Sequence, residues 1–227
     1  MQQSASQYPS LPANASLFTR MRVGVASIRV LMRNPAEPVY GMLFQDALDG
    51  GMLTDMARGF ANVPAGRRLL EQRPELCRGH VDFEALAKLP SGTLGREFAR
   101  FYEGDTGVQP IFTLPREMSD GQYLGKRMRE SHDLHHLLTG YGTDMMGEME
   151  LQAFQLGNLG TPTSLFAVLA GWSNEQVTVP RREYLWRIRA AYQRGRGSPE
   201  MASILWEDHW ATPLEQLRAR FFASRAA

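Results

Sequence analysis

Residues 127–148 read RMRESHDLHHLLTGYGTDMMGE and contain three of the chain's five histidines. If residues 127–139 form a helix, His132 and His136 lie one turn apart on nearly the same face. Asp133 lies beside them, about 100° round the helix axis. This spacing predicts that two imidazoles and one carboxylate can reach the same ion.

A turn follows the histidines and predicts that the chain reverses. Gly140 and Gly142 break the helix, and Thr143 or Asp144 can cap a second helix. Glu148 then lies a little over one turn into that helix and can face the histidines. The sequence therefore predicts a central helix hairpin that brings four potential metal ligands together: His132, Asp133, His136 and Glu148.

Two imidazoles and two carboxylates suit Zn²⁺, and would also accept Fe²⁺, Mn²⁺ or Co²⁺. His135 lies three residues after His132 and could replace His136 as a ligand, but we expect it to line or flank the site. The alternative interpretation is a histidine-rich helix surface in solvent. The neighbouring carboxylates favour a metal site.

Other metal motifs fit less well. Metalloproteases carry Glu after the first His as general base, where this chain has the shorter Asp133. A di-iron bundle needs two acidic-x-x-His pairs, and this chain has one, Asp133 with His136. A His-Asp metal hydrolase would need distant ligands such as His80 and Asp208 and is a weaker alternative.

The composition limits the classes of partner and compartment. With 25 basic and 24 acidic residues, the net charge of +1 gives no electrostatic case for a nucleic-acid partner. Cys77 is the sole cysteine, so no disulfide framework forms, as suits a reducing compartment. Basic residues are nearly all arginine, a bias typical of GC-rich coding that indicates a bacterial source.

The 227 residues predict one all-α domain, residues 17–227, after a disordered tail, residues 1–16. No run of about 18 apolar residues indicates a membrane span. Caps and breakers predict helices at 17–33, 38–48, 52–60, 66–73, 83–88, 94–103, 119–138 and 181–194, with further helix starts at Thr161, Ser198 and Thr212.

The first of these helices is amphipathic and precedes every acidic residue of the chain, the first being Glu37. Leu17, Met21 and Val25 recur at helical spacing, with arginines elsewhere round the helix. Such a segment can pack on a core, lie on a membrane surface, or imitate a mitochondrial targeting peptide. We expect it to pack on the core.

Residues 132–148 resemble the ubiquinone (coenzyme Q) biosynthesis family conventionally called Coq-four, whose pattern is His-Asp-x-x-His followed after eleven residues by Glu. The resemblance continues at residues 66–74, 89–95, 123–130, 205–208 and 214–218, and covers nearly the whole chain beyond the first 16 residues. His135 departs from the family, in which many members carry a bulky residue such as tryptophan there.

The resemblance implies an all-helical protein that holds a divalent metal, usually described as zinc, beside a groove for a polyprenylated aromatic ring. The family has been treated as an organiser of the ubiquinone-synthesis complex and as the catalyst that replaces the C1 carboxylate of the ring with a hydroxyl. We favour the enzyme, a polyprenyl-hydroxybenzoate decarboxylase, because structural zinc sites are more often cysteine-rich. The non-catalytic, lipid-binding scaffold stays open.

Three further residues are candidates for a catalytic role. Arg129, four residues before Asp133, could hydrogen-bond that ligand or receive the substrate carboxylate. Glu130 or His135 could move the proton. We expect residues 165–170 and the first helix to border a groove for the isoprenoid tail.

The expected partners are a polyprenylated quinone precursor, other ubiquinone-biosynthesis proteins and a membrane surface, with a homodimer left open. The expected location is the cytoplasmic side of a bacterial inner membrane, to which the protein binds peripherally. In a eukaryote it would be the mitochondrial matrix face.

Overall fold

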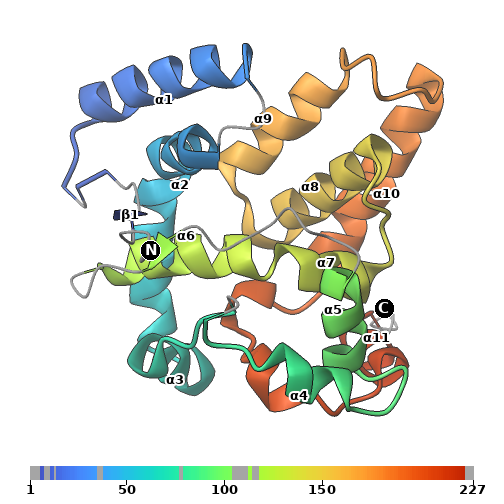
Figure 1. Ribbon diagram of the computed structural model, residues 1–227. Coiled ribbons are helices and arrows are strands. Elements are labelled where there is room, and N and C mark those ends of the chain that lie inside the picture. The colour runs from blue at the N-terminus through green and yellow to red at the C-terminus, as the bar shows by residue number, and fades with distance from the viewer. Residues whose placement is uncertain are drawn as a thin grey trace, which may run out of the picture.

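A computed structural model describes residues 6–7, 11–12, 14–34, 38–76, 79–103, 112–113 and 118–222. Within these residues the chain is all-helical apart from two very short strands (Figure 1), which confirms the predicted class. The helices are α1 Leu17–Leu31, α2 Pro38–Phe60, α3 Pro64–Gln72, α4 Phe83–Ala87, α5 Leu94–Glu103, α6 Asp120–Glu130, α7 His132–Thr139, α8 Met145–Leu159, α9 Pro162–Gly171, α10 Arg181–Gly197 and α11 Leu214–Phe222.

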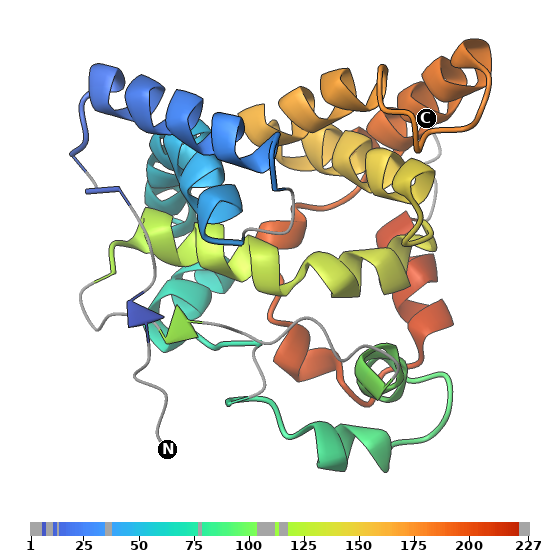
Figure 2. The same cartoon turned by 45° about the horizontal axis from the view of Figure 1, so that its top comes forward.

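Two helical groups flank α6 and α7, which cross the middle of the molecule (Figures 1 and 2). On one side α2 packs between α1 and α6, and on the other α8 packs between α9 and α10. One apolar cluster joins α2, α3 and α6 around Leu53, Leu69 and Leu124, and a second surrounds Phe98 and Trp206. The central pair therefore contacts both cores.

The segment expected as two helices, 38–48 and 52–60, is one helix, α2. We had expected Gly50 and Gly51 to end the first of them. Instead Gly50 is buried, and a Cβ atom built on it would lie 2.4 Å from Nη1 of Arg20. The glycine makes room for the arginine of α1, which donates to the Asp46 carbonyl oxygen at 2.9 Å.

The helix expected at 119–138 is divided at Ser131. Its capping box is confirmed: Ser119 accepts from the Gln122 N–H and Gln122 accepts from the Ser119 N–H. Ser131, with φ −87° and ψ 0°, ends α6, and its hydroxyl donates to the Met128 carbonyl oxygen at 3.3 Å. The histidines therefore lie on a separate helix, α7.

The backbones of α8 and α10 come into close contact. A Cβ atom on Gly157 would lie 2.1 Å from the Tyr192 carbonyl oxygen, and one on Gly195 would lie 2.1 Å from that of Phe154. Gly195, which we had expected to end its helix, lies inside α10 instead. The close crossing admits no side chain at this position, which explains the glycine.

The start of the chain contacts the domain at two described places. Ser6–Gln7 (β1) pairs in parallel with Phe112–Thr113 (β2). Leu11 is buried: its N–H donates to Asp46 and its carbonyl oxygen accepts from Gln122. The disorder expected for the rest of residues 1–16 falls partly outside the described residues.

Residues 198–210 form two 3-10 helices, Met201–Ser203 and Trp206–His209, where we had expected a helix that starts at Ser198. The helix expected to start near Thr212 is present as α11, and the one expected near Thr161 is present as α9. None of the described helices has both the length and the hydrophobicity needed to cross a bilayer.

The expectation that α1 packs its apolar stripe on the core is wrong. Leu17 is 74% exposed, Met21 61% and Val25 47%. The buried positions of this helix are Gly24 and Ser27. Small side chains let α1 lie close against α2, where a Cβ atom on Gly24 would be 3.5 Å from that of Ala47. The larger apolar residues consequently face outward.

Candidate metal centre

The predicted hairpin is formed by α7 and α8. Gly140 ends α7 in the left-handed conformation, with φ 77°. Glycine adopts this conformation readily because it has no Cβ atom. Asp144 caps α8 by accepting from the backbone N–H groups of Met146 at 2.9 Å and Gly147 at 3.1 Å. Local capping thus places Glu148, in the first turn of α8, opposite the histidines of α7.

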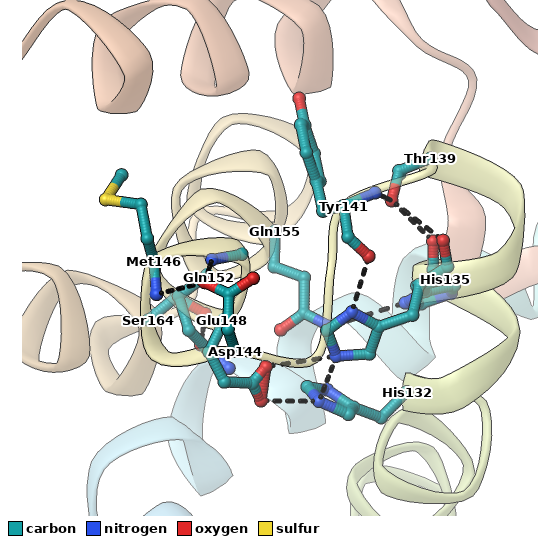
Figure 3. Close-up of polar contacts among 12 residues, drawn as sticks. His132, His135, Thr139, Tyr141, Asp144, Met146, Glu148, Gln152, Gln155 and Ser164 are labelled. Atoms are coloured by element: carbon teal, nitrogen blue, oxygen red, sulfur yellow. Dashed lines mark hydrogen bonds and ion pairs between the residues drawn. The ribbon is translucent and has the colours of Figure 1, made fainter. Parts of the chain in front are cut away.

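Three side chains of this hairpin converge. His132 Nε2 lies 2.8 Å from one carboxylate oxygen of Glu148, and His136 Nε2 lies 3.0 Å from the other. The two Nε2 atoms are 3.2 Å apart. Figure 3 shows His132 and Glu148 pointing toward each other. Among the residues that the structure describes, this is the one group of three or more potential ligands within 4.8 Å of one another.

A second contact orients His136. Its Nδ1 lies 3.1 Å from the Tyr141 carbonyl oxygen, which can only accept, so Nδ1 carries the proton in this bond. In the neutral ring Nε2 is then the lone-pair nitrogen, and it faces the other two side chains. A backbone carbonyl that fixes the tautomer is the arrangement found behind metal-bound histidines.

Glu148 and His136 favour each other's charged forms. Burial opposes ionisation of Glu148, but hydrogen bonds from His132 and His136 outweigh it and hold the Glu148 pKa at about 2. Burial likewise disfavours the imidazolium of His136, but Glu148 raises its pKa above the ordinary value. The centre is thus an anionic carboxylate between two imidazoles, one nearly buried and one partly open to solvent.

This donor set fits a divalent metal. Two histidines and one glutamate are the protein ligands of a well-known class of catalytic zinc sites, in which a fourth position stays open for water or substrate. Cysteine ligands, typical of structural zinc sites, are absent from the three. The partial exposure of His132 and Glu148 would give such an open position access to solvent.

Asp133, the fourth expected ligand, is not part of the converging group. Its charge raises the pKa of His136, so it lies near the centre, and its place as a ligand stays a prediction. His135, which we had expected to line or flank the site, is buried. Its Nδ1 lies 3.3 Å from Nε2 of Gln155, and its ring packs on Trp206 with centroids 5.8 Å apart.

Each of the three candidate catalytic residues has described surroundings, and their catalytic roles stay predictions. Burial and, to a smaller extent, the nearby His132 lower the pKa of His135 to about 3, so the ring is neutral near pH 7. Glu130 accepts from Lys126 at 2.5 Å and from the Leu76 N–H at 3.1 Å. Arg129 donates to Gln45, and burial lowers its pKa to about 9, so it stays cationic at neutral pH.

The distant pair considered for a metal hydrolase lies elsewhere. His80 contacts Glu75 at 3.2 Å and borders a cavity of 520 Å³ near Trp210. Asp208 pairs with Arg68 at 2.7 Å. Neither belongs to the converging group.

Sequence reasoning missed Tyr141, which orients His136, and Gln155, which contacts the neighbouring His135. Tyr141 acts through its backbone carbonyl, for which side-chain identity gives no signal. Gln155 follows Glu148 by seven residues, two helical turns along the same face of α8. That spacing was a signal that could have identified Gln155.

The fold and this centre define a class: an all-helical protein with a two-histidine, one-glutamate group on a helix hairpin. The chain belongs to the family described as "Coenzyme Q (ubiquinone) biosynthesis protein Coq4", whose model matches residues 12–225.

Curated relatives agree with this assignment. The chain is 32% identical over 158 residues to the mitochondrial "Ubiquinone biosynthesis protein COQ4 homolog" of Rattus norvegicus. That match covers 68% of this chain and 59% of the relative. It is 33% identical over 162 residues to the COQ4 protein of Phaeosphaeria nodorum. That match covers 69% of this chain and 54% of the relative. The chain thus spans less than two thirds of these relatives.

The crystal structure of a candidate ubiquinone biosynthesis protein from Nostoc punctiforme has the same fold. The two structures superimpose with a TM-score of 0.70 and 24% sequence identity. The match covers 89% of this chain and 96% of the Nostoc chain.

Proposed function

We propose that the protein acts in ubiquinone biosynthesis as a metal-dependent enzyme that replaces the C1 carboxylate of a polyprenylated 4-hydroxybenzoate-derived ring with a hydroxyl. The convergence of His132, His136 and Glu148 carries this proposal, because it offers nitrogen and oxygen ligands with a solvent-accessible side. Family membership supports the pathway. Zn²⁺ is the metal that this donor set suits best, and Fe²⁺, Mn²⁺ and Co²⁺ are the alternatives.

The reaction breaks the bond between C1 and the carboxyl carbon, releases CO₂ and forms a C1–O bond. With water as the source of the hydroxyl oxygen, the reaction removes two electrons and two protons overall, and an external oxidant, dioxygen, accepts them to give hydrogen peroxide. A divalent cation in this centre would act as a Lewis acid toward the charge that decarboxylation leaves on the ring and its phenolic oxygen.

The side chains of the centre have separate tasks in this proposal. His132, His136 and Glu148 would hold the cation, and the Tyr141 carbonyl, which accepts from Nδ1 of His136, would keep the lone pair on Nε2 directed at it. Arg129 is a fixed positive charge three residues before His132 and is the candidate partner for the substrate carboxylate. Asp133 is a candidate fourth ligand.

The isoprenoid tail of the substrate needs an apolar path. Leu165 and Leu169 on α9 are exposed, as are Leu17 and Met21 on α1. We propose that the tail lies along these helices and that the protein binds a membrane peripherally, on the cytoplasmic face in a bacterium. Binding that fails to strengthen with prenyl-chain length would contradict the tail assignment.

The test uses purified protein of known metal content. A prenylated hydroxybenzoate is incubated with it under air and under nitrogen, and the decarboxylated, hydroxylated ring is measured. We expect product under air only, and loss of both metal and product in Glu148→Gln. Glu150→Gln is the matched control, since Glu150 lies on the same helix but pairs with Arg187 at 2.6 Å. A metal-free protein with full turnover would refute the proposal.

The second candidate is a scaffold that binds prenyl lipids and other ubiquinone-biosynthesis proteins. The exposure of large apolar side chains on three helices favours it, because such surfaces often bind partners. A Glu148→Gln protein that folds, lacks metal and fully restores quinone synthesis in cells without the native protein would establish the scaffold over the enzyme.

A further inference from the structure

The turn between α7 and α8 carries the backbone oxygen that orients His136. That oxygen belongs to Tyr141 and lies 3.1 Å from His136 Nδ1. Gly140 precedes it with φ 77°, and the backbone of a glycine is freer than that of any other residue. Thr139 and Tyr141 flank the glycine (Figure 3). The direction of the His136 lone pair therefore depends on what holds these two flanking residues in place.

Arg194 of α10 contacts both of them. Its Nη1 donates to the carbonyl oxygen of Thr139, the last residue of α7, at 2.7 Å. Its Cζ lies 5.3 Å from the centre of the Tyr141 ring and 4.0 Å from that of Phe222, over each ring. A planar guanidinium can bind an oxygen and stack on aromatic rings at the same time. One side chain of a helix distant in sequence thus holds the turn on both sides of the glycine.

No carboxylate pairs with Arg194 in the described part of the chain. Arg187, on the same helix, pairs with Glu150 at 2.6 Å, whereas the partners of Arg194 are a carbonyl oxygen and two rings. Burying part of a cation without a counter-charge costs free energy, which these contacts must offset. Arg194 therefore has a role that an ion pair does not explain.

Arg218 of α11 provides a comparison at the same helix end. It donates to the carbonyl oxygens of Leu137 at 2.8 Å and Leu138 at 3.2 Å. Among the contacts of the described residues, none joins Arg218 to Tyr141. Cations near the last carbonyl groups of a helix stabilise it, so both arginines stabilise α7. Of the two, Arg194 alone also contacts the residue whose carbonyl orients the histidine.

We propose that Arg194 is a positioning residue of the metal centre: it fixes the Tyr141 carbonyl oxygen, and this oxygen directs Nε2 of His136 at the cation. The inference rests on the metal centre of the proposed function and is independent of the reaction assigned to it. Without the arginine the turn would adopt several orientations, so binding of a cation would have to order it. Affinity for metal should then fall although the three ligands are unchanged.

Zn²⁺ titration of the purified protein, stripped of metal with a chelator, tests this role. Arg194→Met should weaken Zn²⁺ binding about tenfold, the lower end of the effect of groups that orient metal ligands. Arg194→Lys keeps a donor for the Thr139 carbonyl oxygen and should recover part of the loss. In protein loaded with Co²⁺ the visible absorption bands report the ligand geometry, and Arg194→Met should shift them.

Arg218→Met is the matched control, because it removes a cation from the same end of α7. It should lower the melting temperature, as Arg194→Met does, but leave the Zn²⁺ affinity and the Co²⁺ bands unchanged. A second test combines Arg194→Met with Tyr141→Ala. If the arginine acts through this residue, the double variant should lose less affinity than the product of the two single losses.

Three results would overturn the inference: unchanged Zn²⁺ affinity in a folded Arg194→Met protein, equal losses of affinity in Arg194→Met and Arg218→Met, or single losses that multiply in the double variant. Should Arg194→Met fail to fold, unchanged affinity in Tyr141→Ala overturns it instead. A wild-type protein that binds no divalent cation would refute the metal centre itself. Metal binding without turnover would refute the proposed chemistry and leave the role of Arg194 standing.

Discussion

α1 and α6 both pack on α2, but they differ in which side chains they bury. α1 exposes its hydrophobic residues, with Leu17 74% exposed. α6 buries charged ones: Lys126 is 4% exposed and Arg127 1%. Every buried charge of that pair has a partner, since Lys126 lies between Glu75 and Glu130, and Arg127 binds Glu207 with two bonds of 2.7 and 2.8 Å.

The comparison teaches that polarity alone does not determine which face of a helix is buried here. A charge can be buried when the opposite element supplies its counter-charge and hydrogen bonds. An apolar side chain stays outside when the contact with its neighbour demands small residues, as Gly24 and Ser27 provide in α1. The partner surface decides both cases.

The largest expected effect concerns the buried charge of α6. Arg127→Met removes the partner of Glu207 and leaves the Pro74 and Ile204 carbonyl oxygens without this donor. We expect the free energy of unfolding in urea to fall by about 3–5 kcal/mol. In the exposed pair, Arg68→Met should cost less than about 1 kcal/mol. Equal losses would remove the distinction between inner and outer charges.

The next prediction compares two neighbouring histidines of α7. His136→Ala removes a nitrogen of the converging group and should weaken Zn²⁺ binding more than about 100-fold, or about 2.7 kcal/mol. His135→Ala should keep the metal and lower the melting temperature, because its ring packs on Trp206. Metal analysis and thermal unfolding of both variants provide the measurement, and an equal loss of metal would show that the ligand pair is misassigned.

Asp49 lies on α2, the layer between the two contrasting helices. Burial raises its pKa from 3.8 to about 6, against the hydrogen bond from the Thr163 N–H. The native state thus holds this proton more tightly than the unfolded chain does, so the stabilisation is complete below about pH 4 and is lost as pH rises through 6. A shift of this size corresponds to about 2–3 kcal/mol.

Asp49→Asn keeps an oxygen that can accept from Thr163 and removes the titration. Urea unfolding of both proteins between pH 4 and pH 7 should show the fall in the wild type and a flatter profile in the variant. Superimposable profiles would mean that Asp49 ionises normally in the folded protein.

The smallest effect is expected on α1. Phe18→Gln should change the free energy of unfolding by less than about 0.5 kcal/mol in lipid-free solution, because the ring is 75% exposed. Leu124→Ala on α6, where the side chain is fully buried, should cost about 2–5 kcal/mol. A large loss from Phe18→Gln would indicate that α1 packs differently in solution.

Local signals in the sequence predicted much of this structure. The capping box at Ser119 and the cap at Asp144 involve residues within a few positions of each other, and the helices that they begin, α6 and α8, are present. The spacing of His132, His136 and Glu148 likewise needed only a helix, a turn and a second helix. Such features depend on chemistry that neighbouring residues complete themselves.

What the sequence did not predict depends on distant contacts. Gly50, inside α2, lies against Arg20 of another helix, and the buried His135 lies against Gln155 and Trp206. The outward stripe of α1 has the same periodicity as an inward one, so only the packing on α2 reveals its direction. Asp133 shows the limit of spacing, since adjacency to His132 placed it near the centre but outside the converging group.

The crossing at Gly157 and Gly195 has a mechanical consequence. No side chains separate the two backbones there, so no compressible layer can absorb a displacement of one helix relative to the other. α8, which carries Glu148, and α10, which carries Trp186, should therefore move together as a rigid pair. A displacement of α10 near Trp186 would then move α8, and with it the Glu148 carboxylate, as one rigid body.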